Sequence, residues 1–250
     1  MVFSRANGPN LRLIAFFLSS ALILSPAPTS EEFPRELASE LEAVLARYEA
    51  AVPMQNQAML GVDSTVDYEA RFTELHEQGR WRFLRKISRL GEVNFDQLSA
   101  FVGDDRVKKE LIVRSLQEEQ DAKAYGALKV TLADYKFAIN AILTKNSRKV
   151  YHFDVTPRTN AAGLFQGKVE IDGETGMPLK ESGRLVKSPH WILNNVRFTR
   201  DYELRNGIAV VKRFEGHVNV RFLGIGPAEI VADYSDYQPA VELPAGDRAL

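Results

Sequence analysis

The stretch that decides the fold is Phe165–Val186, which reads FQGKVEIDGETGMPLKESGRLV. Apolar and polar residues alternate on both sides of its centre, as in strands that bury one face. Between them, Asp172–Pro178 is rich in the Gly and Asp residues that tight turns require. This stretch therefore predicts two antiparallel strands, at 164–172 and 179–186, joined by a short turn.

The same pattern continues on both sides of this hairpin. Residues 150–155 form a predicted strand, and residues 135–143 are ambiguous, with their neighbours favouring a strand. Asn206-Gly207 is a strong hairpin signal. Because no helical pattern separates the strands, a parallel βαβ architecture is disfavoured and a long, curved antiparallel sheet is expected. The remaining predicted strands lie at 191–204, 208–222 and 228–237.

The N-terminal half adds a helix and a second group of strands. Residues 31–52 carry apolar residues at helical spacing, and Pro53 is expected to end that helix. Strict alternation from 65 to 73 predicts a strand. A turn at Gln78-Gly79 leads into a second strand at 80–83, and a short third strand is predicted within 93–102.

Residues 104–124 favour an amphipathic helix, although a strand stays open for this segment. The chain is therefore predicted to be α+β and mainly β. A curved, incomplete antiparallel sheet would carry the N-terminal helix, and a second helix if 104–124 is helical, on its concave face. Residues 31–238 are expected to form a single domain, and 239–250 a frayed tail.

The first thirty residues predict export. Arg5 and Arg12 flank a short apolar run that ends in small residues and prolines at 25–30, the pattern of a cleavable signal peptide over residues 1–30. An uncleaved single-span anchor is the alternative. Export to the periplasm would leave a soluble mature protein without a transmembrane span, and it would separate the protein from cytosolic ATP and NAD.

The amino-acid composition further limits the partners and the site chemistries that this chain can have. The 250 residues contain 32 basic and 33 acidic side chains and no cysteine. The charge balance disfavours nucleic acid as a partner. The missing thiols exclude thiol catalysis, thiolate metal sites and lipid attachment through an N-terminal cysteine. The densest basic stretch is interpreted as the solvated face of a strand, with an anion-binding patch as the alternative; it contains Arg80, Arg82, Arg85, Lys86 and Arg89.

Catalytic motifs are not apparent. The four histidines are scattered, and His152 with Asp154 is interpreted as a surface pair on one face of a strand. There is no nucleophile elbow, phosphate loop or dinucleotide fingerprint. The sequence therefore predicts no enzyme, cofactor or metal site. A hydrolase of unknown type stays an alternative, because the sequence does not show whether two carboxylates meet at the separation that glycoside hydrolysis needs.

Several segments together resemble exported bacterial proteins of the outer-membrane lipoprotein-sorting type, the LolA/LolB-like superfamily, and above all its less characterised members. The resemblance follows the order of elements from about residue 60 to 237, and its sharpest part is Ile171-Asp172-x-Glu174-Thr175-Gly176-x-Pro178. The other segments that carry it are Tyr151–Pro157, Gly163–Asp172, Glu174–Lys180, Gly183–Pro189 and Phe198–Tyr202.

The resemblance implies a LolA-like half-barrel whose hydrophobic concave face holds a lipid or the acyl chain of a lipoprotein, in a non-catalytic carrier or sensor. Burial of each methylene would contribute roughly 0.8 kcal/mol. A module that binds an envelope protein is the alternative. Strand alternation proposes the ligand-binding residues, for which ordinary core packing is the competing interpretation: Phe72, Trp81, Phe83, Val169, Phe198, Tyr202 and Phe222.

Overall fold

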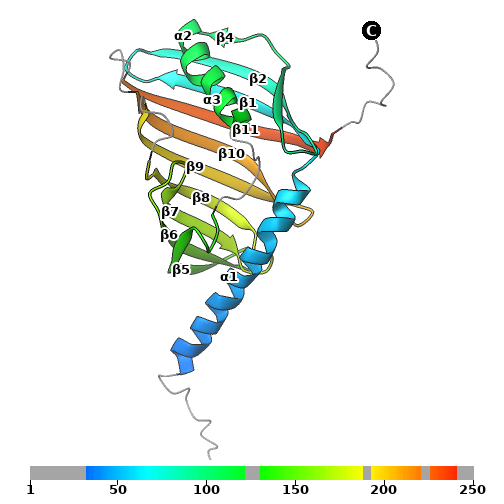
Figure 1. Ribbon diagram of the computed structural model, residues 1–250, viewed down its shortest axis with the longest axis vertical. Coiled ribbons are helices and arrows are strands. Elements are labelled where there is room, and N and C mark those ends of the chain that lie inside the picture. Colours follow the sequence, from blue (N-terminus) through cyan, green and yellow to red (C-terminus); the bar gives the residue numbers. More distant parts are fainter. Residues whose placement is uncertain (1–31, 122–129, 188–192, 221–225, 241–250) are drawn as a thin grey trace, which may run out of the picture. The chain divides into compact units, whose positions relative to one another are not determined.

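Within the described residues, eleven strands form one sheet whose hydrogen-bonded neighbours all run antiparallel (Figure 1). The structure is a computed structural model that describes residues 32–121, 130–187, 193–220 and 226–240. The strands are β1 (Val62–Phe72), β2 (Glu77–Ile87), β3 (Val93–Gln97), β4 (Val102–Gly103), β5 (Tyr135–Lys145), β6 (Arg148–Pro157), β7 (Phe165–Asp172), β8 (Pro178–Leu185), β9 (Leu193–Arg205), β10 (Ile208–Val220) and β11 (Gly226–Pro239).

The sheet order is β3-β2-β1-β11-β10-β9-β8-β7-β6-β5, with the short β4 paired to β2. Most neighbours are consecutive in the chain, as short hairpins require. Besides the β2–β4 pair, the exception is β1, which pairs with β11 over Val62–Phe72 and so joins the first strand to the last. β3 and β5 remain as the two edges. The predicted mainly β fold, with a curved antiparallel sheet that is not closed, an N-terminal helix and a further helix, is confirmed.

Two helical segments accompany the sheet. They are α1 (Glu32–Ala58), and a continuous segment formed by α2 (Asp105–Val107), the π-helical η1 (Lys108–Val113) and α3 (Arg114–Asp121). The chain divides into a compact unit from Ser39 to Leu250 and a preceding unit of residues 1–38, of which only the start of α1 is described. The fold and the sites below all belong to the unit that begins at Ser39.

The central turn shows how the local sequence builds the hairpin of β7 and β8. Asp172 is 1% exposed, and its Oδ1 accepts hydrogen bonds from the backbone N–H groups of Glu174 (3.2 Å) and Thr175 (2.8 Å). Gly176 has a φ of +73°, and a Cβ there would lie 2.6 Å from the carbonyl carbon of Arg47 in α1. The turn thus needs glycine both for its backbone conformation and for the close approach of the helix.

The helix α1 does not end at Pro53 as predicted; it continues to Ala58. Proline removes one backbone hydrogen bond from a helix interior. Contacts made by residues before and after Pro53 hold α1 in place. Tyr48 Oη donates to the carbonyl of Val130 at 2.6 Å, and the buried Gln55 side chain accepts a hydrogen bond from the N–H of Ala209 at 2.9 Å and donates to its carbonyl.

The segment 104–124 is helical as far as it is described, to Asp121. Val107, Leu111, Ile112 and Leu116 recur at helical spacing, and all four are buried. They pack on an apolar cluster built mainly by β1, β2 and β11 (Figure 1). The π-turn at 108–113 keeps Val107 and Ile112, five residues apart, in the same cluster.

Helices cover one face of the sheet, here called the inner face. Cluster 1 is the apolar cluster around α2–η1–α3, and cluster 2 surrounds α1, where Val44 and Tyr48 pack against β6, β7 and β9. The buried members of cluster 1 are Val66, Tyr68, Ala70, Phe72, Phe83, Val107, Leu111, Ile112, Leu116, Ala228 and Ala232. Those of cluster 2 are Val44, Tyr48, Val130, Tyr135, Tyr151, Phe153, Val155, Phe165, Val169, Ile171 and Phe198. Phe214 on β10 packs against both clusters. The inner face therefore has two helix-covered apolar ends, with β9 and β10 between them.

The predicted turn at Gln78-Gly79 is wrong, because both residues lie inside β2 and the chain turns at 73–76, where His76 has a φ of +55°. The remaining boundaries differ only slightly from prediction. The predicted strand 93–102 is divided into β3 and β4, and β11 extends to Pro239, the first residue of the predicted tail. The 135–143 segment is a strand, as favoured. The predicted signal peptide, residues 1–30, lies outside the described residues, and so do 241–250. Among the described helices, none is both long enough and apolar enough to cross a membrane.

Candidate ligand-binding face

Between the two apolar clusters, the inner face carries charged and phenolic side chains. On β9, alternation turns Phe198, Arg200 and Tyr202 toward the helices. Arg200 Nη1 lies 3.0 Å from Glu181 Oε2 on β8 and donates to Tyr202 Oη at 3.4 Å. The Glu181 side chain is 2% exposed and that of Arg200 is 35% exposed. A buried carboxylate thus holds an arginine that is still reachable from solvent.

The pair is incompletely satisfied. Glu181 Oε1 is buried and has no hydrogen-bond partner within the described chain. The Arg200 guanidinium lies 5.8 Å from the ring centre of Phe198 and 5.9 Å from that of Phe214, so its charge is stabilised partly by aromatic faces. Burial, and next the charge of Glu181, raises the pKa of Tyr202 far above its ordinary value, which keeps this phenol neutral.

A second pair joins the sheet to α3. Arg85 Nε on β2 donates to Glu119 Oε1 at 2.7 Å, and the Tyr68 hydroxyl donates to Glu119 Oε2 at 3.3 Å. The Arg85 side chain is 7% exposed, and its guanidinium lies 6.0 Å from the ring centre of Tyr234. Burial, the largest cause, raises the pKa of Tyr234 to about 12.

The two pairs belong to one electrostatic group. Arg85, Glu119 and Arg200 all influence the pKa of Tyr234, which lies on β11 between them. These residues cross the inner face from β8 to β2 and are here called the polar seam; they are Glu181, Arg200, Tyr202, Tyr234, Arg85 and Glu119. Ionised groups lose hydration when they are buried, so the seam is the electrostatically costly part of this face.

The predicted binding residues within the described chain lie on the inner face but in three separate clusters. Phe72, Trp81 and Phe83 belong to cluster 1 and contact the α2–η1–α3 segment or its neighbours. Val169 and Phe198 belong to cluster 2. The other two are Tyr202, which packs beside Ala51 and Met177, and Phe222, which lies outside the described residues.

Most of these residues contact the protein's own side chains. Phe72 and Val169 are fully buried. Trp81 is partly buried, and its ring centre lies 4.7 Å from that of Phe83 and 4.7 Å from Lys108 Nζ. Phe198 and Tyr202 differ from the others, because they flank Arg200 and so border the polar seam.

Sequence reasoning did not identify the charged members of the seam. Arg85 was interpreted with its basic neighbours as solvated, and this is wrong, because its side chain is buried. A signal existed, since Arg85 shares the alternation of Trp81, Phe83 and Ile87. Arg200 likewise alternates with Phe198 and Tyr202. Both arginines differ from the exposed charged residues because each stands at an inward-facing position of a strand whose other inward-facing residues are mainly apolar.

The described residues contain no group of three or more His, Asp or Glu side chains arranged to hold a metal ion. His152 faces Glu170, with Nδ1 3.6 Å from Oε1. Asp154 accepts a hydrogen bond from Asn140 at 2.8 Å instead. The His152 and Asp154 side chains are therefore engaged with different neighbours.

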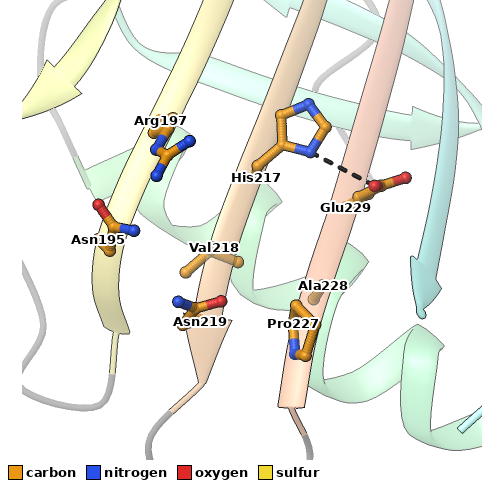
Figure 2. Close-up of a pocket in the computed structure, with 8 residues that line it drawn as sticks. All are labelled: Asn195, Arg197, His217, Val218, Asn219, Pro227, Ala228 and Glu229. Carbon is orange, nitrogen blue, oxygen red and sulfur yellow. Dashed lines mark ion pairs between the residues drawn. The ribbon is translucent and has the colours of Figure 1, made fainter. Parts of the chain in front are cut away.

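A separate hollow of about 340 Å³ opens on the outer face of the sheet, near the ends of β9, β10 and β11 (Figure 2). Figure 2 shows Arg197, His217 and Glu229 side by side across these strands, with His217 Nδ1 3.5 Å from Glu229 Oε1. The hollow has both polar and apolar lining, and the other residues that line it are Asn195, Val218, Asn219, Pro227 and Ala228.

Several solved structures of other proteins are similar to this chain. The chain is similar to a LolA superfamily protein from Nitrosomonas europaea, with 12% identity, a TM-score of 0.43, and coverage of 81% of this chain and 94% of that one. It is similar to a Vibrio parahaemolyticus domain named for outer-membrane lipoprotein sorting, with 14% identity, a TM-score of 0.45, and coverage of 84% and 96%.

A third likeness is to the MucA/MucB complex of Pseudomonas aeruginosa, with 11% identity, a TM-score of 0.22, and coverage of 83% and 100%. No protein-family model and no curated protein sequence matches the chain. Structures named for the LolA superfamily and for lipoprotein sorting are thus among those to which the chain is similar.

Proposed function

We propose that this chain is an exported, non-catalytic protein that binds an amphiphile, such as a lipid or an acylated polypeptide, on the inner face of its sheet. The acyl chain would lie between the two apolar clusters, and its polar end would meet Arg200. The observation that carries the proposal is a guanidinium that is 35% exposed within an aromatic surface.

Arg200 suits the polar end of such a ligand. Its guanidinium carries five N–H donors, and the hydrogen bonds that it makes to Glu181 and Tyr202 both use Nη1. The remaining donors can bind a carboxylate, phosphate or ester oxygen, for which planar guanidinium geometry is well suited. Glu181 keeps the guanidinium in place while those donors stay available.

The surface beside Arg200 suits the apolar end. The rings of Phe198 and Phe214 stack at 6.3 Å between centres, with an angle of 17° between their planes. Phe214, Val218 and Ile230 are only partly buried in the described chain. Each methylene buried there would contribute roughly 0.8 kcal/mol, so an acyl chain of ordinary length could bind strongly.

The export part of the proposal rests on the N-terminal sequence, whose charged, apolar and small-residue regions follow the order of a signal peptide. In the bacterial periplasm, lipids and acylated proteins are abundant amphiphiles that need shielding from water. Binding without chemistry fits the seam, because its phenols have raised pKa values and its carboxylates are paired with arginines.

The test is to purify the chain in detergent-free buffer and analyse it by native mass spectrometry, followed by titration with a fluorescent fatty acid. We expect co-purified lipid and saturable binding. Phe214→Ala should weaken that binding at least tenfold while leaving the Arg200–Glu181 pair intact. Phe95→Ala, which truncates another partly buried aromatic on β3, is the matched control.

Two results would contradict the proposal. One is a lipid-free protein that also fails to bind the fluorescent fatty acid. The other is binding that Phe214→Ala and Phe95→Ala affect equally, because an effect shared with the control would reflect general loss of packing. Thermal unfolding of both variants shows whether each is folded under the conditions of the titration.

A second candidate function is recognition of an envelope protein. The favouring observation is that β5 is an edge of the sheet and exposes Ile139 (37%) and Leu143 (53%). An open edge can pair with an extended segment of another chain. A pull-down from envelope extract that recovers one stoichiometric protein and no lipid would favour this candidate over amphiphile binding.

A further inference from the structure

The outer face of the sheet is organised in rows of charged side chains that run across neighbouring strands. In one row Lys180, Asp201, Arg213 and Asp233 are successive cross-strand partners. Their charges alternate, and ion pairs form at 3.0 Å (Lys180–Asp201) and 2.7 Å (Arg213–Asp233). Opposite charges in directly facing positions stabilise a sheet.

A nearby row breaks this alternation. Arg184 on β8 faces Arg197 on β9, and Arg197 faces His217 on β10. All three side chains are exposed. No carboxylate stands between them, and within the described chain neither arginine forms an ion pair. Like charges in facing positions destabilise a sheet, so the two facing arginines carry uncompensated positive charge, whereas His217 lies 3.5 Å from the Glu229 carboxylate.

The nearest carboxylates are already engaged. Glu229, the cross-strand partner of His217, accepts a hydrogen bond from Arg71 Nε at 2.6 Å. Glu215 accepts one from Arg213 Nε at 2.7 Å. Neither side chain is therefore free to neutralise Arg184 and Arg197, and the positive charge of the row faces solvent.

The row borders the hollow of the outer face. Arg197 and His217 line that hollow together with the amides of Asn195 and Asn219 (Figure 2). A β-bulge between β9 and β10 accompanies this arrangement, and Asn195 has a φ of +52°. Amide N–H groups and guanidinium groups are hydrogen-bond donors, so the hollow combines the Arg197 guanidinium with neutral donors. The Glu229 carboxylate also lines the hollow, and it is paired with Arg71.

We propose that Arg184, Arg197 and His217, with the amides of Asn195 and Asn219, bind a phosphate group on the outer face. A phosphate can neutralise facing arginines and accept several hydrogen bonds at once. This site lies on the face opposite the polar seam and does not depend on amphiphile binding there. Because it is open to solvent, its affinity should fall with salt concentration.

The phosphate could belong to a free anion or to a lipid headgroup, and the experiment distinguishes these sources. The full chain is titrated calorimetrically with inorganic phosphate in a non-phosphate buffer at constant ionic strength. In parallel, it is sedimented with vesicles of phosphatidylglycerol and with vesicles of phosphatidylcholine. Saturable binding of inorganic phosphate indicates a site for a free anion, and binding to phosphatidylglycerol vesicles alone indicates a headgroup site.

Arg184→Gln and Arg197→Gln should each weaken whichever interaction is observed at least tenfold. Lys168→Gln removes an exposed positive charge from the same face, on β7, and should change it less than twofold. Both arginine variants should unfold at or above the wild-type temperature, because each relieves the repulsion between facing arginines. Absence of both interactions, or equal losses in all three variants, would overturn the proposal.

Discussion

Arg200 and Glu181 form an ion pair on the inner face of the sheet, with Arg200 Nη1 3.0 Å from Glu181 Oε2. The carboxylate is buried and the guanidinium is partly exposed. The pair is therefore asymmetric: the carboxylate is shielded from solvent, while the guanidinium is partly accessible to it.

Removal of the Glu181 charge should destabilise the protein. Glu181→Gln leaves the Arg200 guanidinium without its counter-ion, which should cost about 1–3 kcal/mol, less than for a fully buried pair because Arg200 is partly solvated. Urea unfolding measures the difference. Glu69→Gln, an exposed change on β1, should stay within about 0.5 kcal/mol of wild type. Equal effects of the two changes would show that the pair is unimportant.

The turn between β7 and β8 should be intolerant of a methyl group. In Gly176→Ala the Cβ would contact the backbone of α1 at 2.6 Å, and the φ of +73° is unfavourable, so we expect a loss of about 2–4 kcal/mol. Gly207→Ala has a similar φ of +79° with no atom within 4 Å of the added Cβ. It should cost only about 1–2 kcal/mol. Similar losses would show that α1 does not pack on this turn.

Pro53 should be a site of easy stabilisation. It is exposed within α1 and interrupts the backbone hydrogen bonds of the helix. Pro53→Ala restores a donor and should raise the free energy of unfolding by about 1–3 kcal/mol. Ala50→Ser, at another exposed position of the same helix, serves as the comparison and should be slightly destabilising. A neutral or destabilising Pro53→Ala would mean that the helix is adapted to a bend at this position.

The stability that Glu40 contributes through its hydrogen bonds with Lys149 and Tyr151 on β6 should depend on pH. Hydrogen bonds from Lys149, the largest cause, and from Tyr151 lower the pKa of Glu40 below its ordinary value of 4.5. The folded state therefore binds this proton less readily than the unfolded state. The stabilisation is present above pH 4.5 and is lost as the pH falls through the lower folded-state pKa.

Glu40→Gln should accordingly be less stable than wild type at pH 7, and the difference should shrink as the pH is lowered below 4.5. Tyr151→Phe removes one of the two donors and should show a weaker form of the same trend. Urea unfolding across this pH range provides the measurement. A difference that stays constant with pH would contradict the role given to Glu40.

The parts of the fold that could be predicted from sequence depend on neighbouring residues. The turn at Asp172–Pro178 is determined by the carboxylate of Asp172 and the conformation of Gly176, both visible in a short window. The pairing of β1 with β11 could not be read in this way, because it joins residues 62–72 to residues 228–239. The continuation of α1 past Pro53 depends on the distant contact of Gln55 with Ala209 for the same reason.

The candidate site was predictable to a smaller extent. Alternation placed Phe198 and Tyr202 correctly on the inner face, yet it treated apolar residues as the signal and disregarded Arg200 between them. The burial of Glu181 and Arg85 became clear only when β8, β9 and α3 were assembled. Charged residues at inward strand positions carry information about a site, but only three-dimensional packing shows whether they are paired.

Amphiphile binding on the inner face is measured most directly by photo-crosslinking of the full chain with a diazirine-labelled fatty acid, read residue by residue by tandem mass spectrometry. We expect adducts on Phe198, Tyr202 and Phe214, reduced by an excess of unlabelled fatty acid. No competed adducts, or adducts confined to the outer face around Arg197 and His217, would contradict amphiphile binding on the inner face.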